Sequence, residues 1–197
     1  MVSLTAMAKR TSQVLHATKR DAILDAALDL VVEGGFHGAP MSAISKRAEA
    51  SPGVIYHHFS SKEEIFQAVY ERARLLKRGS LLEGYTPAMP ARDAFILVAL
   101  NTYSFYRKHH REIRFVDLYE DAGFPIPASA LKPTPEAVQF QQRFCGKSHG
   151  GILVDLPDEV ISEMTFGLVA RLAKQPKKLS EAILREIAER VWSSLKA

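Results

Sequence analysis

Apolar residues in this chain recur at intervals of three and four positions along nearly its whole length. That spacing places them on one side of an α-helix, whereas alternating apolar and polar runs bounded by turn signals, which indicate strands, are hard to find. With 197 residues, 47% of them hydrophobic, the chain can build a packed core. The sequence therefore predicts an all-α protein, long enough for one domain of average size and a smaller one.

The helix boundaries follow from caps and glycines. A first helix is expected over residues 19–33, capped by Thr18 and ended by Gly34 and Gly35. Pro52 suits the first position of a short helix that Ser51 can cap. Helices are expected at 41–49, 52–57, 62–78, 92–109, 112–122, 135–144, 158–175 and 179–195.

The leading segment is wholly basic. Lys9, Arg10, Lys19 and Arg20 all precede Asp21, the first acidic residue. Such an arm can lie along DNA phosphates or in a minor groove, although a solvated chain end with incidental charge explains the same residues. Residues 1–18 are expected to form a flexible arm, and the net charge of +4 selects no class of partner by itself.

Several classes of protein are disfavoured by what the sequence lacks. No apolar run approaches the roughly 18 residues of a membrane span, so a cytoplasmic protein without membrane contact is expected. Cys145 is the only cysteine, which excludes an internal disulfide and favours a buried thiol. His57 and His58 are adjacent on a helix and point about 100° apart, so no metal site is expected. No cofactor is expected either.

Residues 35–62 have the pattern of two short helices that pack on each other. Met41, Ile44 and Ala48 form the inner face of the first, and Ile55 and Phe59 close over them. The outward positions are Ser42, Ser45, Lys46, Pro52, Gly53, Val54, Tyr56 and His57. A short helix that exposes small and hydrogen-bonding side chains fits a DNA major groove, which is about 12 Å wide.

This stretch closely resembles the DNA-binding domain of the TetR family of bacterial transcription regulators, over residues 20–70. The matching residues are Gly35, Phe36, Met41, Ile44, Ala48, Ser51, Gly53, Ile55, Tyr56, His58, Phe59, Ser61, Lys62, Glu63, Glu64 and Ile65. Two positions depart from the family pattern. Pro40 replaces a capping Thr or Ser, which transfers a phosphate contact to Ser42, and Glu49-Ala50 replaces Gly-Val in the turn, which implies strain or a different turn.

The resemblance implies a role for each outward residue. Tyr56, His58 and Lys62 would contact phosphates, together with the amide groups at the start of the helix that Lys62 begins. Base edges would face Pro52, Gly53, Val54 and His57, of which only His57 can hydrogen-bond. Specificity would therefore also depend on Lys46 or Arg47, the basic arm and DNA shape.

The later helices suggest a ligand-binding region rich in aromatic residues. Candidate ligand contacts are Tyr103, Tyr106, Arg107, Phe115, Tyr119, Phe140, Phe144 and Phe166. They suit an apolar or aromatic small molecule, with Arg107 available for a carboxylate. Ordinary core packing explains each aromatic residue at least as well, since helical bundles need large side chains.

The last two helices carry apolar stripes that are typical of a dimer interface. The residues concerned are Val160, Met164, Gly167, Leu168, Ile183, Ile187, Val191 and Trp192. Two such helices from each subunit would form a four-helix interface, as the resemblance implies. The alternative is that both stripes cover the core of a single chain.

The sequence thus predicts a DNA-binding domain over residues 19–66 and a ligand-binding and dimerisation domain over 67–197. The expected protein is a homodimeric repressor that binds a palindromic operator in double-stranded DNA and releases it when a small molecule binds. One alternative is a related ligand-binding or interaction module without operator recognition. Another is an enzyme using His109 and His110 near Glu112, Asp117 and Glu120, although no motif organises them.

Overall fold

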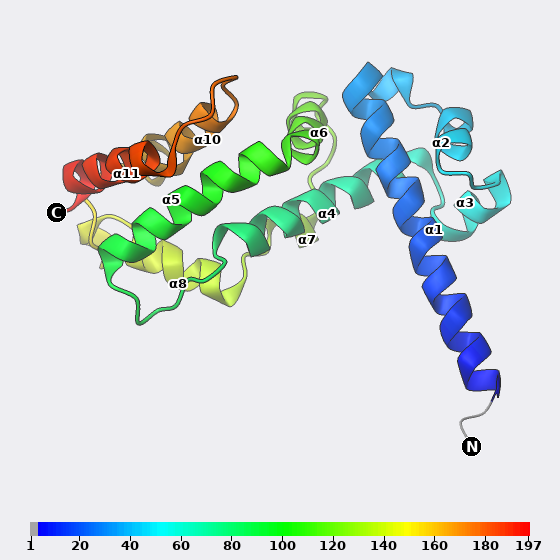
Figure 1. The fold of residues 1–197 in the computed structure, drawn as a ribbon, viewed down its shortest axis with the longest axis horizontal. Helices are drawn as coiled ribbons and strands as arrows, with labels where there is room; N and C mark the ends of the chain where they lie inside the picture. Colours follow the sequence, from blue (N-terminus) through cyan, green and yellow to red (C-terminus); the bar gives the residue numbers. More distant parts are fainter. Residues whose placement is uncertain (1–3) are drawn as a thin grey trace. The chain divides into compact units, whose positions relative to one another are not determined.

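The computed structural model describes the backbone of residues 4–197 and the side chains of residues 19–197. The prediction of an all-α protein is confirmed (Figure 1). Across the described residues there is no β-strand, only isolated bridges that join Leu153 to Gly146 and to Lys196. No described helix is long and apolar enough to cross a lipid bilayer.

The helices lie close to their predicted positions. They are α1 (Leu4–Gly34), η1 (Phe36–Gly38), α2 (Met41–Arg47), α3 (Pro52–His58), α4 (Lys62–Leu81), α5 (Ala91–Lys108), α6 (His110–Asp121), α7 (Ala128–Leu131), α8 (Pro135–Arg143), η2 (Lys147–His149), α9 (Asp158–Ser162), the π-helical turn η3 (Glu163–Gly167), α10 (Leu168–Ala173) and α11 (Glu181–Leu195). The short helix α7 was not predicted.

The start of α1 is the main difference from the prediction. The helix begins at Leu4, so Thr18 lies inside it rather than at its N-cap. Residues 1–3 of the expected basic arm lie outside the described residues, and the remainder of the arm is a continuation of α1. The apolar stripe of residues 19–33 was a correct signal for a helix, but it could not show where the helix begins.

The chain divides into two compact units that do not follow the predicted domain boundary. Unit 1 runs to Arg74 and also contains Arg111–Ala130, whereas unit 2 consists of Leu75–His110 and Leu131–Ala197. The α4 helix therefore begins in unit 1 and ends in unit 2, and the chain returns to unit 1 with α6.

The core of unit 1 joins α1, α2, α3 and α4. Ile44 of α2 and Ile55 of α3 are fully buried, as are Ile23 of α1 and Ile65 of α4. Phe59 and Ala48 are buried with them, which confirms the predicted packing of the two short helices. Figure 1 shows α2 and α3 beside the part of α1 that precedes η1.

Aromatic rings attach α6 to this core. The ring of Phe36 makes edge-to-face contacts with Phe66, Phe115 and Phe124, with centroids 5.0, 5.9 and 4.8 Å away. Such pairs contribute about 0.5–1.5 kcal/mol each beyond the burial of their surface. We call these four rings the Phe36 cluster. It fixes a segment far along the chain against η1 and α4.

A hydrogen bond reinforces the contact between α4 and α6. The hydroxyl group of Tyr70 donates to Glu120 Oε1 at 2.6 Å, and the Tyr70 ring stacks on Tyr119 at 4.5 Å. Desolvation and, after it, the hydrogen bond to the Glu120 carboxylate raise the pKa of Tyr70 to about 12. Burial also raises the pKa of Tyr119.

Unit 2 is built around α5, which packs against α10 and α11 (Figure 1). One cluster of buried residues contains Phe95, Phe140, Phe144, Ile161 and Trp192. A second cluster lies along the same helix and contains Ile96, Ala99, Tyr103, Val169 and Leu184, among others. Both faces of α5 are therefore enclosed within this unit.

The turn between α2 and α3 is held by a complete set of hydrogen bonds. The amide of Ala50 donates to the carbonyl of Ser45 and the amide of Glu49 to that of Lys46, as in a Schellman motif. Ser45 Oγ donates to the carbonyl of Ala50 at 2.7 Å, and Lys19 Nζ donates to the carbonyl of Glu49 at 3.1 Å. The left-handed position of this motif, normally glycine, is Glu49 with φ 48. Glu49 thus adopts a positive φ, which favours glycine and is the condition for the strain that was expected as one of two outcomes.

Replacing Glu49 with glycine should raise the free energy of unfolding by about 0.5–1 kcal/mol. Glycine escapes the roughly 1–2 kcal/mol penalty of a left-handed L-residue, which exceeds its extra entropy in the unfolded chain. Urea denaturation followed by circular dichroism measures the change. Glu49→Ala removes the same carboxylate but keeps Cβ, so it should give no such gain; equal stabilities of the two variants would contradict the assignment of strain.

Replacing Tyr70 with phenylalanine should lower the free energy of unfolding by about 1 kcal/mol at neutral pH, because the hydrogen bond to Glu120 is lost. The folded state favours the neutral phenol of Tyr70. The stability that this preference adds to the folded protein is therefore fully present below the unfolded pKa of 10.0 and is lost as the pH rises through about 12. Tyrosinate absorbance of the wild type should include a tyrosine that ionises near pH 12, and Tyr70→Phe should lack it while keeping the raised pKa of Tyr119. A wild-type protein in which every tyrosine ionises near pH 10 would refute this.

Candidate nucleic-acid interface and ligand cavity

The helix α3 presents one exposed face. Ser51 caps it by accepting a hydrogen bond from the amide of Val54, and Pro52 occupies its first turn, where a missing amide costs nothing. Ile55 is buried, whereas Gly53, Tyr56 and His57, which share a face at helical spacing, are exposed. Tyr56 is 59% exposed, an unusual state for a large aromatic residue that has no packing role there.

Two of the predicted contacts on α3 are less accessible. Val54 is half-buried and packs against the core of unit 1, so only part of its side chain can reach a thymine methyl group. His58 is half-buried as well, and its ring lies 5.3 Å from that of His57 and 6.3 Å from that of Phe59. The exposed surface of α3 is therefore formed chiefly by Pro52, Gly53, Tyr56 and His57.

The helix α2 contributes Ser42 and Lys46, both exposed as predicted for contacts with DNA. Its N-cap residue Pro40 provides no side-chain hydrogen bond, so the first turn is held only by amides that donate to the Pro40 carbonyl. Arg47 forms an ion pair with Glu33 of α1 at 2.8 Å. Of the two basic residues expected to aid specificity, Lys46 is consequently the one whose side chain is available.

The start of α4 forms a capping box. Ser61 Oγ accepts from the amide of Glu64, while the Glu64 carboxylate accepts from the amide and the hydroxyl of Ser60, both at 2.6 Å. The side-chain and backbone hydrogen bonds from Ser60 lower the pKa of Glu64, and Arg20 contributes in the same direction. The capping box leaves the amides of Lys62 and Glu63 as the donors that can meet a phosphate, beside the half-buried Lys62 side chain.

The basic residues before Asp21 lie on α1. Lys19 donates to the turn at Glu49, and the guanidinium of Arg20 lies 5.2 Å from the centre of the Phe59 ring. Both side chains thus adjoin the helix-turn-helix. The side chains of Lys9 and Arg10 fall outside the described residues.

The eight predicted ligand residues do not meet at one site. Phe115 and Tyr119 belong to the core of unit 1, whereas Phe140, Phe144 and Phe166 line a cavity in unit 2. The prediction of a single aromatic ligand site from these eight residues is therefore corrected. Their spacing in sequence showed helices, but not the unit in which each helix packs.

The polar members of that set have structural partners. The hydroxyl of Tyr103 accepts from the amide of Leu179 at 2.8 Å, and Arg107 donates to the carbonyls of Ala173 and Gln175. Both side chains border a hollow of about 700 Å³, yet these bonds use the groups that would have oriented a ligand. Tyr106 accepts from Lys77 Nζ at 2.9 Å.

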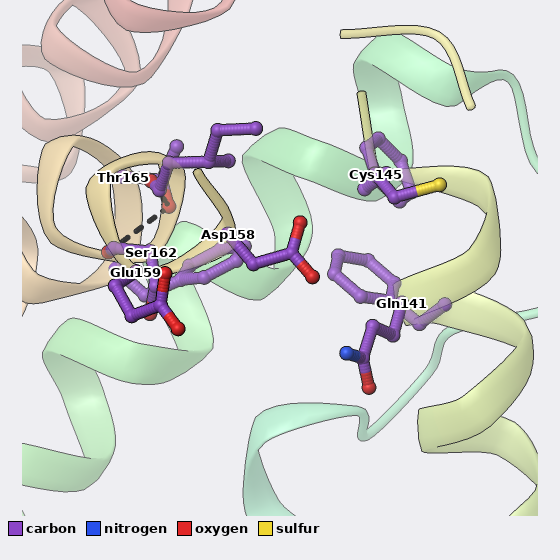
Figure 2. A pocket seen from close by; sticks show the side chains of 10 residues that line it. Gln141, Cys145, Asp158, Glu159, Ser162 and Thr165 are labelled. Atoms are coloured by element: carbon purple, nitrogen blue, oxygen red, sulfur yellow. Dashed lines mark hydrogen bonds between the residues drawn. The ribbon is translucent and has the colours of Figure 1, made fainter. Parts of the chain in front are cut away.

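The cavity beside Phe140 has a volume of about 410 Å³, within the range of small-molecule sites. Its apolar wall consists of Phe140, Phe144, Ile161 and Phe166. Its polar residues are Gln141, Cys145, Asp158, Glu159, Ser162 and Thr165. Figure 2 shows Gln141 and Cys145 on one side of it and the four residues of α9 and η3 on the other.

The sequence analysis missed these polar residues, although a signal was present. Asp158, Ser162 and Thr165 follow one another at helical spacing, so they share a face that differs from the face of Val160 and Met164. The apolar stripe of the helix was recognised, whereas no role was predicted for the polar stripe beside it. Only the folded chain places that polar stripe opposite α8.

The predicted dimer residues fall into three groups. Val160, Met164 and Ile183 are 40%, 42% and 47% exposed, and Leu168, Ile187 and Val191 are half-buried. Trp192 is buried, with its ring 5.4 Å from that of Phe95, so it belongs to the core of unit 2 and its assignment to the interface is corrected.

Gly167 also has a different neighbour from the one expected. A Cβ atom there would lie 2.7 Å from the carboxylate of Glu163, which pairs with Arg171 at 2.8 Å. The space beside this glycine is thus filled by a side chain of its own helical segment rather than left open for a second helix.

Two residues of the enzyme alternative have structural partners. The ring of His109 stacks on Phe105 at 4.8 Å, and Glu120 accepts the hydrogen bond from Tyr70. No group of three or more potential metal-ligating side chains was found among the described residues.

Sequence comparisons identify the N-terminal part of the chain. Residues 23–69 match the family "Bacterial regulatory proteins, tetR family". The transcriptional regulator UidR of Escherichia coli is 52% identical over 50 residues, which are 25% of this chain and 26% of UidR. The fatty acid metabolism regulator protein of Bacillus subtilis is 34% identical over 61 residues, or 31% of this chain and 29% of that protein. The matched region thus spans less than a third of these relatives.

Comparison of folds extends the likeness to nearly the whole chain. A TetR family transcription regulator from Marinobacter aquaeolei has a TM-score of 0.82 at 14% identity, covering 93% of this chain and 98% of that one. A second, from Vibrio parahaemolyticus, has a TM-score of 0.71 at 23% identity, covering 91% and 99%. These relatives and neighbours are named as transcription regulators or regulator proteins. The chain therefore carries the N-terminal domain of the bacterial TetR family of transcription regulators, and it has the fold of that family.

Proposed function

We propose that the protein is a ligand-responsive transcriptional repressor, which binds a palindromic operator as a homodimer and releases it when a small molecule binds. The observation that carries the proposal is the exposed face of α3, with Tyr56 59% exposed and Gly53 and His57 beside it. A short helix held by a tight turn on a packed core can enter a major groove without rearrangement. The exposed Ser42 and Lys46 of α2 would add contacts with the DNA.

The apolar stripes on the segment formed by α9 and η3 and on α11 support the homodimer. Val160, Met164 and Ile183 are large apolar side chains exposed to solvent within a single chain. Burying them against a second copy would recover about 25 cal/mol for each Å² of apolar surface removed from water. A helix as short as α3 also needs a second half-site for specific binding, which a two-fold dimer supplies.

The path of the chain between the two units supports a coupling of ligand binding to DNA binding. The α4 helix begins with Lys62, next to the helix-turn-helix, and ends in unit 2. The α6 helix follows α5 of unit 2 directly and belongs to unit 1 through the Phe36 cluster. A ligand that changed the packing of unit 2 would act on unit 1 through α4 and through the junction of α5 with α6. The functional division into a DNA-binding part, residues 19–66, and a ligand-binding part, residues 67–197, belongs to this proposal.

Repression is the direction that needs the fewest contacts. A dimer bound across a promoter blocks it by occupancy alone, whereas activation requires a further surface that engages the transcription machinery. One relative is named for the opposite direction: FasR of Mycolicibacterium smegmatis, 39% identical over 64 residues, is named a transcriptional activator. We propose repression for this protein because it requires contacts with only the DNA, the ligand and the second subunit.

Selection of bound fragments from a random pool of double-stranded DNA, at physiological salt, tests the proposal. Recovery of one palindromic sequence, with half-sites about a helical turn or more apart, would support a dimeric repressor. Absence of any preferred sequence, with the same protein shown to be folded and dimeric, would reject operator recognition and favour the ligand-binding module. A reporter gene placed behind the selected site then distinguishes repression from activation.

Replacing Lys62 with alanine should reduce the salt dependence of DNA binding, lowering the slope of log K against log salt by about one. The positive charge next to the α4 amides displaces a counterion when it meets a phosphate. Binding isotherms over a range of salt concentrations measure the slope. His57→Ala is the comparison, since it should change the preference among sites and leave the slope intact. An unchanged slope for Lys62→Ala would remove Lys62 from the phosphate contacts.

Replacing Met164 and Ile183 together with glutamate should convert the dimer to a monomer and weaken operator binding. The charges would be buried without partners in the proposed interface, at a cost of several kcal/mol. Analytical ultracentrifugation gives the mass in solution. Leu75→Glu is the control, because Leu75 is 65% exposed on α4 but is not part of either stripe. A double variant that sediments like wild type as a dimer would place the interface elsewhere.

A further inference from the structure

The cavity of unit 2 combines an apolar wall with a negatively charged mouth. Phe140 and Phe144 come from α8 and its C-cap, and Ile161 and Phe166 come from α9 and η3. Asp158 and Glu159 lie in the first turn of α9, where the helix dipole favours acidic residues. Figure 2 shows the Asp158 carboxylate extending from α9 toward the side of the cavity that carries Gln141.

These two carboxylates differ from their neighbours in having no partner. The side chains of Asp158 and Glu159 form none of the ion pairs or hydrogen bonds found among the described residues, whereas the Glu163 side chain pairs with Arg171 and the Asp155 side chain accepts from the amide of Ser148. No lysine, arginine or histidine of the described chain lines the cavity. The electrostatic field inside it is therefore set by two negative charges.

One cation lies near the wall without entering the cavity. The guanidinium of Arg143 is 5.7 Å from the centre of the Phe144 ring, but it donates to the carbonyls of Pro87 and Met89. Those bonds hold it on the side of α8 that faces the α4–α5 connection. It does not neutralise Asp158 or Glu159.

We infer that this cavity binds a small lipophilic cation, an aromatic or alkyl-aromatic amine or quaternary ammonium ion whose charge lies between Asp158 and Glu159. The faces of aromatic rings attract cations, and the carboxylates supply the opposite charge at the mouth. An anion of the same size would meet two like charges, and a neutral molecule would gain only the apolar wall. The inference names the effector class of the proposed regulator and thus rests on the proposed function.

The chain contains its own reporters for this site. Trp192 is the only tryptophan and lies in the same cluster as the cavity wall, with its ring 6.3 Å from that of Phe144. Cys145 is the only cysteine and lines the cavity. Occupation of the cavity should therefore change the Trp192 emission and slow the modification of Cys145 by a thiol reagent.

The experiment titrates the full-length protein, without DNA, with three probes that share one hydrophobic part: 4-butylbenzyltrimethylammonium, 4-butylbenzyl alcohol and 4-butylbenzoate. Trp192 emission should report the cation binding at least about tenfold more tightly than the alcohol, with the benzoate weakest. The cation should also protect Cys145. In the double variant Asp158→Asn, Glu159→Gln the preference for the cation should disappear while binding of the alcohol is kept.

Glu136→Gln is the matched control. Glu136 is a carboxylate in the first turn of α8 that does not line the cavity, so this variant should keep the wild-type preference. Equal or tighter binding of the alcohol or benzoate, binding that leaves Cys145 unprotected, or a cation preference that survives in the double variant would overturn the inference, as would no binding of any probe.

Release of DNA is measured separately on the selected operator. Cation binding without DNA release would count against the proposed regulation and leave the cation site intact. DNA binding with no cation preference would overturn the site alone.

Discussion

The contact on which the arrangement of unit 1 depends is the packing of the Phe36 cluster. Phe36 follows α1, Phe66 lies on α4, and Phe115 and Phe124 come from a segment that the chain reaches only after passing through α5 of unit 2. These rings have no polar atoms to satisfy, so burial and edge-to-face geometry determine their arrangement. The helix-turn-helix is thus supported by residues that lie outside the sequence motif, which explains why the motif alone does not define a compact unit.

Local signals predicted the helix-turn-helix well. The Ser51 cap, the buried pair Ile44 and Ile55, and the positive φ of Glu49 all depend on contacts within a few turns of the chain. The Schellman motif explains why Glu49 is tolerated, because Lys19 and Ser45 add two hydrogen bonds to a turn that is already closed by backbone amides.

Long-range packing set the limit of prediction. Tyr119 and Phe144 are equally plausible as aromatic ligand residues in the sequence, but one stacks on Tyr70 in unit 1 and the other lines the cavity of unit 2. Helical periodicity gives the face on which a residue lies and contains no information about which helix that face meets. Trp192 shows the same limit, since its stripe on α11 includes both the exposed Ile183 and residues buried in the core.

The segment from α9 to α10 unites two properties of the proposed regulator. One face carries Val160 and Met164, which are exposed, and another carries Asp158 and Thr165, which line the cavity. The π-helical turn η3 interrupts the regular helix between α9 and α10. It contains Thr165, whose hydroxyl donates to the carbonyl of Ile161. Since both faces belong to one hydrogen-bonded segment, a ligand that rotated it to enclose a bound group would also reorient the exposed stripe. Ligand binding and subunit packing would then be linked within a single element of secondary structure, without a separate relay between them.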